Sequence, residues 1–225
     1  MSLKGFAKAG SQRWLQIAIN RKPELLLSAL RRSGAIAHGE SVKWSSPLKD
    51  DDFREYRGAA AFAKARITTL KQKLDSFWPA RGPVWDAIGI TSSGNPLFIE
   101  AKAHIPEAAS PPTKASPVSR ALIDRSLVEA RKFYAPRATA AWSNLFYQYA
   151  NRLAHQYFLK NVNGIPSILV FLYFLNADDM LGPMSEDEWH GAVRLIHAVL
   201  GVRKDLMRYG VFDVFLDARL LQDAV

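Results

Sequence analysis

The chain contains no cysteine, which excludes disulfides, thiolate nucleophiles and cysteine-ligated zinc. Long apolar runs are also missing. The longest lies within residues 165–175, and even these eleven positions are too few for a membrane-crossing helix, which needs about 20. The first ten residues lack the apolar core of a secretory signal. These absences predict a soluble, cytoplasmic protein with no membrane partner.

Several enzyme motifs are absent as well. The sequence has no Gly-x-Ser-x-Gly elbow, no Walker loop, no dinucleotide-binding glycine pattern and no His-Glu-x-x-His. The chemistry of serine hydrolases, P-loop enzymes, Rossmann dehydrogenases and zinc peptidases therefore has no basis in this chain.

The composition is that of a folded protein with a basic surplus. Of 225 residues, 48% are hydrophobic, and 30 basic against 21 acidic residues give a net charge of +9. The length predicts a single domain over residues 1–225. The charge suits a protein that binds the phosphate backbone of nucleic acid. Anionic membranes or acidic proteins would accept it too, and many basic proteins bind no nucleic acid.

The first part of the chain is predicted to be largely helical. Apolar spacing over residues 11–32 indicates two short helices divided at Pro23, within an N-terminal helical elaboration of residues 1–40. A short strand is expected at residues 40–44. Acidic residues before Phe53 favour a helix from there to about Phe77, ended by Pro79.

A β-hairpin is expected next. Residues 83–90 and 96–104 favour strands, and the turn formers at 91–95 separate them. A proline-rich loop follows at residues 105–117. Ser116 before Pro117 is typical of a helix start, which predicts a helix to about Tyr134, and a further helix is expected from Thr139 to about residues 161–164.

The remaining pattern predicts an α/β fold with a mixed sheet. Residues 165–175 are apolar on both faces, as in a central strand covered by helices. Ser185 and Glu188 fit a capping box for a helix over about residues 186–200, and residues 211–216 favour a last strand. We expect residues 41–175 to form the core and residues 176–225 to add a C-terminal helix and strand.

The hairpin carries the residues that favour chemistry. Side chains alternate along a strand, so Glu100, Lys102 and His104 share one face. Charges on a strand suited to burial are costly unless they are paired or used. Pairing of the two strands would bring Asp86 near Glu100, and a divalent cation would relieve the repulsion between the two carboxylates. Oxygen ligands favour Mg²⁺, with Mn²⁺ as the alternative.

This arrangement resembles the PD-(D/E)XK nuclease superfamily, in which an Asp and a Glu-x-Lys on adjacent strands form a metal-dependent phosphodiesterase site. The resemblance covers residues 41–175 in the order of elements, and Asp86, Glu100 and Lys102 carry it. Trp85 stands where the motif usually has proline. Residues 78–86, 100–103 and 147–152 look like an uncharacterised bacterial branch of the superfamily.

The resemblance implies a restriction-endonuclease-like fold with an αβββαβ-type core and extra elements at both ends. It also implies hydrolysis of nucleic acid, with DNA as the expected partner. Asp86, Glu100 and the carbonyl of Ala101 would hold the metal, which polarises the phosphate and acidifies a water molecule. Lys102 would position that water and stabilise the charge that develops on the phosphate.

Further site residues are expected on two helices. Glu55 would add an acidic ligand from the helix before the hairpin, with Glu40 and Glu24 as weaker choices, and an ordinary solvated or capping Glu55 is the alternative. Gln148 matches a glutamine that borders the site in related nucleases.

The helix that carries Gln148 offers further substrate contacts. Arg152 and His155 follow Gln148 at helical spacing, and Asn151 lies beside them. Arg152 would grip a phosphate. The same spacing also fits an ordinary polar helix face. His104 would point toward the site from a regular strand, although a histidine with a structural hydrogen bond is the commoner outcome.

Other readings of the same residues stay open. The charged residues could form a buried ion pair, or the chain could have the fold without the activity. A non-catalytic module that binds nucleic acid or protein is the main alternative, and hydrolysis of a small phosphoester is a third. The sequence leaves open the choice of DNA or RNA, the strandedness of the target and the oligomeric state, a homodimer included.

Overall fold

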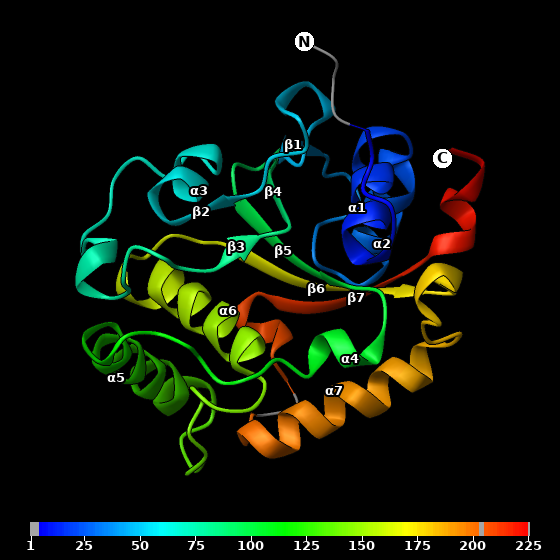
Figure 1. The fold of residues 1–225 in the computed structure, drawn as a ribbon. Coiled ribbons are helices and arrows are strands. Elements are labelled where there is room, and N and C mark those ends of the chain that lie inside the picture. Colours follow the sequence, from blue (N-terminus) through cyan, green and yellow to red (C-terminus); the bar gives the residue numbers. More distant parts are fainter. Residues whose placement is uncertain (1–4, 203–204, 225) are drawn as a thin grey trace.

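The computed structural model describes residues 5–202 and 205–224, and a five-stranded mixed sheet forms their centre (Figure 1). The strands are β1 (Val42–Ser46), β4 (Ala87–Thr91), β5 (Pro96–Lys102), β6 (Ile168–Leu175) and β7 (Val211–Asp217), in that spatial order. The pairs β1–β4 and β4–β5 are antiparallel, whereas the pairs β5–β6 and β6–β7 are parallel. The predicted α/β class with a mixed sheet is therefore confirmed.

Helices cover both faces of the sheet. The helices α1 (Gly10–Asn20) and α2 (Pro23–Arg32) pack on the face that carries Ile99 and Leu172. The opposite face, which carries Phe98 and Phe171, is covered by α3 (Gly58–Lys64), α5 (Pro117–Tyr134), α6 (Tyr147–Tyr157) and α7 (Glu186–Leu200). Two apolar cores thus lie on either side of β5 and β6, which explains why β6 is apolar at almost every position.

Several local expectations are confirmed. Pro23 opens α2 just after α1 ends. The turn between β4 and β5 is closed by Gly94, whose φ of +88° suits glycine. Ser116 accepts a hydrogen bond from the backbone N–H of Ser119 at the start of α5, and Ser185 does the same for Glu188 in α7.

The long helix expected from Phe53 to Phe77 is wrong. The chain there forms β2 (Tyr56–Arg57), α3 and a short 3₁₀ turn at Leu74–Ser76. Asp52 and Phe53 have φ values of 51° and 55°, which lie in the left-handed region and are incompatible with a helix through them. The acidic run instead forms another 3₁₀ turn, at Lys49–Asp51.

The helix predicted to start at Thr139 begins only at Tyr147. The segment before it is tied down by side chains, because the buried Trp142 indole donates to the carbonyl of Leu200 (2.9 Å). Phe146 then has a φ of 59°, which separates that segment from α6. The helix continues into a π-helical turn at Phe158–Val162.

The first strand of the hairpin is interrupted where the site begins. It divides into β3 (Val84–Trp85), which pairs with β2, and β4, and Asp86 lies between the two. The second strand, β5, ends at Lys102, and the proline-rich segment after it contains the short helix α4 (Ile105–Ala108). Pairing between β4 and β5 stops at Ala87 and Ile99, so the last residues of β5 have a neighbouring strand, β6, on one side only.

The smaller elements complete the chain. They are the 3₁₀ turns at Asp178–Met180, Met207–Tyr209 and Ala218–Ala224. Within residues 5–202 and 205–224, no helix is both long enough and apolar enough to cross a membrane.

Candidate active site

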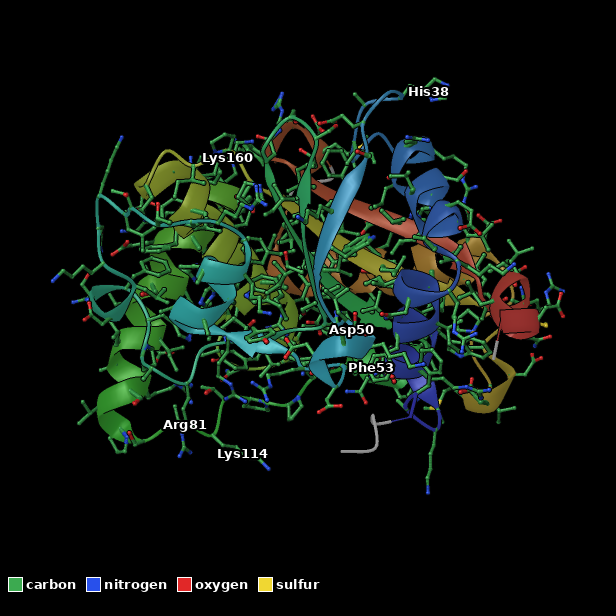
Figure 2. All side chains as sticks on the ribbon, turned by 90° about the horizontal axis from the view of Figure 1, so that it is seen from above. His38, Asp50, Phe53, Arg81, Lys114 and Lys160 are labelled. Carbon is green, nitrogen blue, oxygen red and sulfur yellow. The ribbon has the colours of Figure 1, made fainter. Side chains whose placement is uncertain are left out.

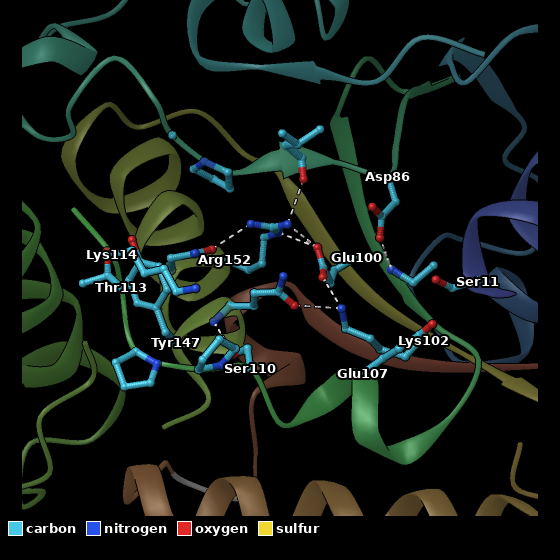
Figure 3. A pocket seen from close by; sticks show the side chains of 18 of the residues that line it. Ser11, Asp86, Glu100, Lys102, Glu107, Ser110, Thr113, Lys114, Tyr147 and Arg152 are labelled. Atoms are coloured by element: carbon cyan, nitrogen blue, oxygen red, sulfur yellow. Dashed lines mark hydrogen bonds and ion pairs between the residues drawn. The ribbon is translucent and has the colours of Figure 1, made fainter. Parts of the chain in front are cut away.

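A cavity of about 580 Å³ opens beside the end of β5 (Figure 3). Asp86, Glu100 and Lys102 all line it, together with Ala101. From α6 come three further lining residues: Gln148, Asn151 and Arg152. The structure therefore brings together most of the residues that the sequence singles out, because α6 packs on the face of the sheet toward which Glu100 and Lys102 of β5 point.

Glu100 is the centre of the charge network. Glu100 is only 2% exposed. One of its carboxylate oxygens, Oε1, accepts a hydrogen bond from Lys102 Nζ at 2.6 Å. The other oxygen, Oε2, accepts one from Arg152 Nε at 2.7 Å and also pairs with Nη2 of the same guanidinium. Burial opposes ionisation of this carboxyl, but the attraction to the two cations outweighs it, so the pKa of Glu100 is lowered.

All three nitrogen atoms of the Arg152 guanidinium donate hydrogen bonds to other groups of the protein. Besides Glu100, its Nη2 donates to the carbonyl of Val84 (2.8 Å) and its Nη1 to Oδ1 of Asn151 (2.7 Å). The guanidinium lies over the Trp85 ring, 4.9 Å from the centroid, and the residue is 4% exposed. The sequence predicts that this arginine grips a phosphate, whereas the structure directs it at Glu100, because a buried carboxylate needs a buried counter-charge.

Asp86 reaches β5 through its side chain. Its Oδ2 accepts a hydrogen bond from the backbone N–H of Ala101 (2.7 Å), and its own N–H donates to the carbonyl of Ile99 (3.2 Å). Burial, aided by the nearby negative charge of Glu100, raises the pKa of Asp86 to about 8. The negative charge of Glu100 thus disfavours ionisation of Asp86, as expected of acidic groups that converge.

The oxygen donors at this point fit a hard divalent cation. Asp86, Glu100 and the Ala101 backbone border one cavity, and carboxylate and carbonyl oxygens are the ligands that Mg²⁺ and Mn²⁺ prefer. A cation between the carboxylates would offset both the burial and the negative charge of Glu100, which together raise the pKa of Asp86. Within the described ranges, no three acidic or histidine side chains form a metal-holding group, so the set consists of two carboxylates and one carbonyl.

Gln148 contacts Lys102. Its Oε1 accepts a hydrogen bond from Lys102 Nζ at 3.0 Å, and its backbone N–H donates to the hydroxyl of Ser110 (2.8 Å) at the start of α6. Lys102 therefore lies between two acceptors, Glu100 and Gln148, with 13% of its side chain exposed. Its ammonium group is fixed at the wall of the cavity, where a polar group of a ligand can reach it.

His155 does not line the cavity, contrary to the expectation that it contacts substrate. It packs between Trp78 and Trp85, with ring centroids 4.7 and 6.2 Å away. Its Nδ1 hydrogen-bonds the carbonyl of Asn151 (2.9 Å), and Nε2 has no partner among the described residues. Burial lowers the pKa of His155 to about 3, so the ring is a neutral part of the core.

His104 and Glu55 also lie outside the lining. Strand β5 ends at Lys102, so the alternation that would turn His104 inward stops before it, and His104 Nδ1 lies 3.3 Å from Glu107 Oε1. Glu55 is in the loop before β2 rather than on a helix, and its Oε1 accepts from Gln12 of α1 (2.9 Å). The weaker choices, Glu24 and Glu40, are absent from the lining too.

Several lining residues are not predicted from the sequence. Glu107 of α4 lines the cavity, and its Oε2 accepts from the Ala103 N–H (2.7 Å). An acidic residue directly after the Glu-x-Lys strand is the signal that could have indicated it. Tyr147 lies next to Gln148 at the start of α6. Ser11, Arg81 and Lys114 come from distant segments, and no local pattern marks them.

Comparison with known proteins identifies no relative. No family model matches the sequence, and neither the curated proteins nor the solved structures include a match to this chain.

Proposed function

We propose that this chain is a metal-dependent nuclease of the PD-(D/E)XK superfamily, using Mg²⁺ or Mn²⁺ and acting on DNA. The topology supports the assignment of residues 41–175 as a restriction-endonuclease-like core. Three antiparallel strands, β1, β4 and β5, are followed by helices and by β6, which is parallel to β5. β7 extends this core as the additional C-terminal strand.

The observation that carries the proposal is the convergence of three groups on one cavity. Asp86 is hydrogen-bonded to the residue that separates Glu100 from Lys102, and all three line the same hollow. In a buried ion pair without function, one acid and one base would suffice. The second carboxyl, that of Asp86, forms no ion pair within residues 5–202 and 205–224, and burial raises its pKa, which is typical of a functional site.

The chain's own residues have separable tasks in this mechanism. Asp86, Glu100 and the Ala101 carbonyl would hold the cation, which when bound polarises the scissile phosphate and makes water more acidic. Lys102 donates to an oxygen of the phosphate or orients the attacking water, because its ammonium reaches the cavity wall. Gln148 holds that ammonium from the other side, and Arg152 keeps Glu100 ionised and in place.

A binding module without hydrolysis is the second candidate, and one observation favours it. Both oxygens of Glu100 are already engaged by cations of the protein, Lys102 and Arg152. Such a carboxylate is neutralised without a metal. The two candidates differ in whether Asp86 and Glu100 take up a divalent cation.

Cleavage of fluorescent DNA strands and plasmid in Mg²⁺ or Mn²⁺ tests the proposal. Lys102→Ala should lower the cleavage rate at least about 100-fold, since loss of one transition-state donor has effects of that order. Asp86→Asn should abolish metal-dependent cleavage. Lys132→Ala, which removes an exposed lysine of α5 away from the cavity, is the control and should cleave as the wild type does. Equal rates for Lys102→Ala and the wild type would remove the assignment.

A further inference from the structure

The positive charges of the cavity fall into two groups. Lys102 and Arg152, which lie deep, are both paired with Glu100. Arg81 and Lys114 also line the cavity but are exposed, and within the described ranges neither makes a hydrogen bond or an ion pair. Figure 2 shows both side chains extending outward at one edge of the molecule. The uncompensated positive charge of the cavity therefore lies at its rim.

The acidic groups lie elsewhere in the same cavity. In Figure 3, Lys114 with Thr113 and Tyr147 is at one side, Asp86 is at the other, and Arg152 and Glu100 lie between them. A phosphate bound near Asp86 and Glu100 would thus leave the rim cations free. They would attract a second anionic group of the same ligand.

From this separation we propose that Arg81 and Lys114 form a subsite for a phosphate that flanks the scissile one, and that the substrate is a single strand of nucleic acid. The inference rests on the proposed function for the position of the scissile phosphate. A small phosphoester has one phosphate and would leave the rim pair without a partner. A polynucleotide supplies further phosphates along its backbone.

The burial of Glu100 and Lys102 at the inner end of the cavity favours a single strand over a duplex as the substrate. The scissile phosphate must approach Glu100, which is 2% exposed, and Lys102, whose side chain is 13% exposed. A flexible single strand can bend its backbone into such a recess, whereas a stiff duplex presents its phosphates on a convex surface. Tyr147, half-buried in the wall near Lys114, offers a ring on which an unpaired base can stack.

Binding without metal tests this subsite independently of cleavage. A fluorescein-labelled oligothymidylate is titrated in EDTA, over a range of NaCl concentrations, against the wild type and Arg81→Ala/Lys114→Ala. The double variant should bind about tenfold more weakly. Its slope of log K against log[NaCl] should fall in magnitude by about 1.4, because each lost phosphate contact to a single strand contributes about 0.7.

The matched control is Lys132→Ala/Arg137→Ala, which removes two exposed basic residues outside the cavity. It has the same change in net charge and should bind as the wild type does. Equal slopes for the two double variants would overturn the subsite, and tighter binding of a duplex than of the single strand would overturn the choice of substrate. If the double variant binds more weakly but the wild type cleaves nothing, the rim pair is a phosphate-binding subsite of a binding module, and the nuclease proposal is removed.

Discussion

Arg152 pairs with Glu100 through two of its nitrogen atoms while its guanidinium lies on the ring of Trp85. Both charged residues are nearly closed to solvent, at 4% and 2% exposure. The pair joins α6 to β5, so the helix that carries Gln148 is fixed relative to the strand that carries the proposed catalytic lysine. The positions of Gln148 and Lys102 in the cavity wall thus depend on the buried Arg152–Glu100 pair.

Removal of this arginine should destabilise the protein. Arg152→Met would leave Glu100 buried with Lys102 as its only cation, and loss of one partner of a buried pair costs about 3–5 kcal/mol. Urea unfolding measures the change. Arg208→Met breaks the exposed Arg208–Asp205 pair and should change the free energy of unfolding by at most about 1 kcal/mol. Similar values for the two variants would show that Arg152 is not the structural anchor of Glu100.

Asp86→Asn should remove a carboxyl group whose ionisation is opposed by folding. The pKa of Asp86 rises from 3.8 to about 8 on folding, so the unfolded chain loses its proton first, and wild-type stability declines as the pH rises between these values. Asparagine keeps an oxygen that can accept from the Ala101 N–H. Relative to the wild type, the variant should therefore gain at least about 1 kcal/mol between pH 4 and pH 8, as measured by urea unfolding.

The opposite result, a variant that loses stability relative to the wild type over this range, would show that the ionised Asp86 is compensated in the folded protein. Glu100, whose pKa is lowered, contributes a dependence of the other sign in both proteins. Comparison of the variant with the wild type largely removes that contribution.

Divalent cations should stabilise the wild type and not Asp86→Asn. A ligand that binds only the folded state at 100 times its dissociation constant adds about 2.7 kcal/mol. Thermal unfolding in Mg²⁺, in Mn²⁺ and in EDTA measures the shift, and calorimetric titration gives the affinity. Lys102→Ala should keep the metal response although it loses cleavage, because the lysine is not a ligand. A metal-induced shift of equal size in Asp86→Asn would remove Asp86 from the proposed metal site.

His155 should make the protein sensitive to acid. Its pKa falls from 6.5 to about 3 on folding because the ring is buried, so the unfolded state takes up a proton first as the pH decreases from about 6.5. His155→Gln should lose less stability than the wild type between pH 6.5 and pH 4. His38→Gln, at an exposed position, should follow the wild type. Identical acid profiles for all three proteins would place the acid-sensitive group elsewhere.

Local patterns were sufficient for much of the fold and for the centre of the site. The hairpin, the capped helices α5 and α7 and the buried β6 all follow from short-range signals. Alternation along β5 places Glu100 and Lys102 on one face, and the structure confirms that both line the cavity. These features depend on residues close together in the sequence, so they can be predicted from one sequence alone.

The errors arise where tertiary contacts decide. Spacing places Gln148, Arg152 and His155 on one helix face, but it does not show that Arg152 turns to a buried carboxylate or that His155 enters a tryptophan cluster. The left-handed backbone of Asp52 and Phe53, which ends the expected helix, has no glycine to mark it. Arg81 and Lys114 reach the cavity from separate loops, and only the assembled sheet and helices bring them there.

The side-by-side pairing of β5 with β6 has a consequence for how this chain folds. Odd-numbered residues of β5, such as Ile99 and Ala101, enter the core beneath α1 and α2, while Glu100 and Lys102 face α6. A slip of one position would push both charged side chains among the alanines and leucines of that core and expose isoleucine to Arg152. Glu100 and Lys102 therefore also favour the observed register of β5, because any one-residue shift would bury both charges in an apolar core.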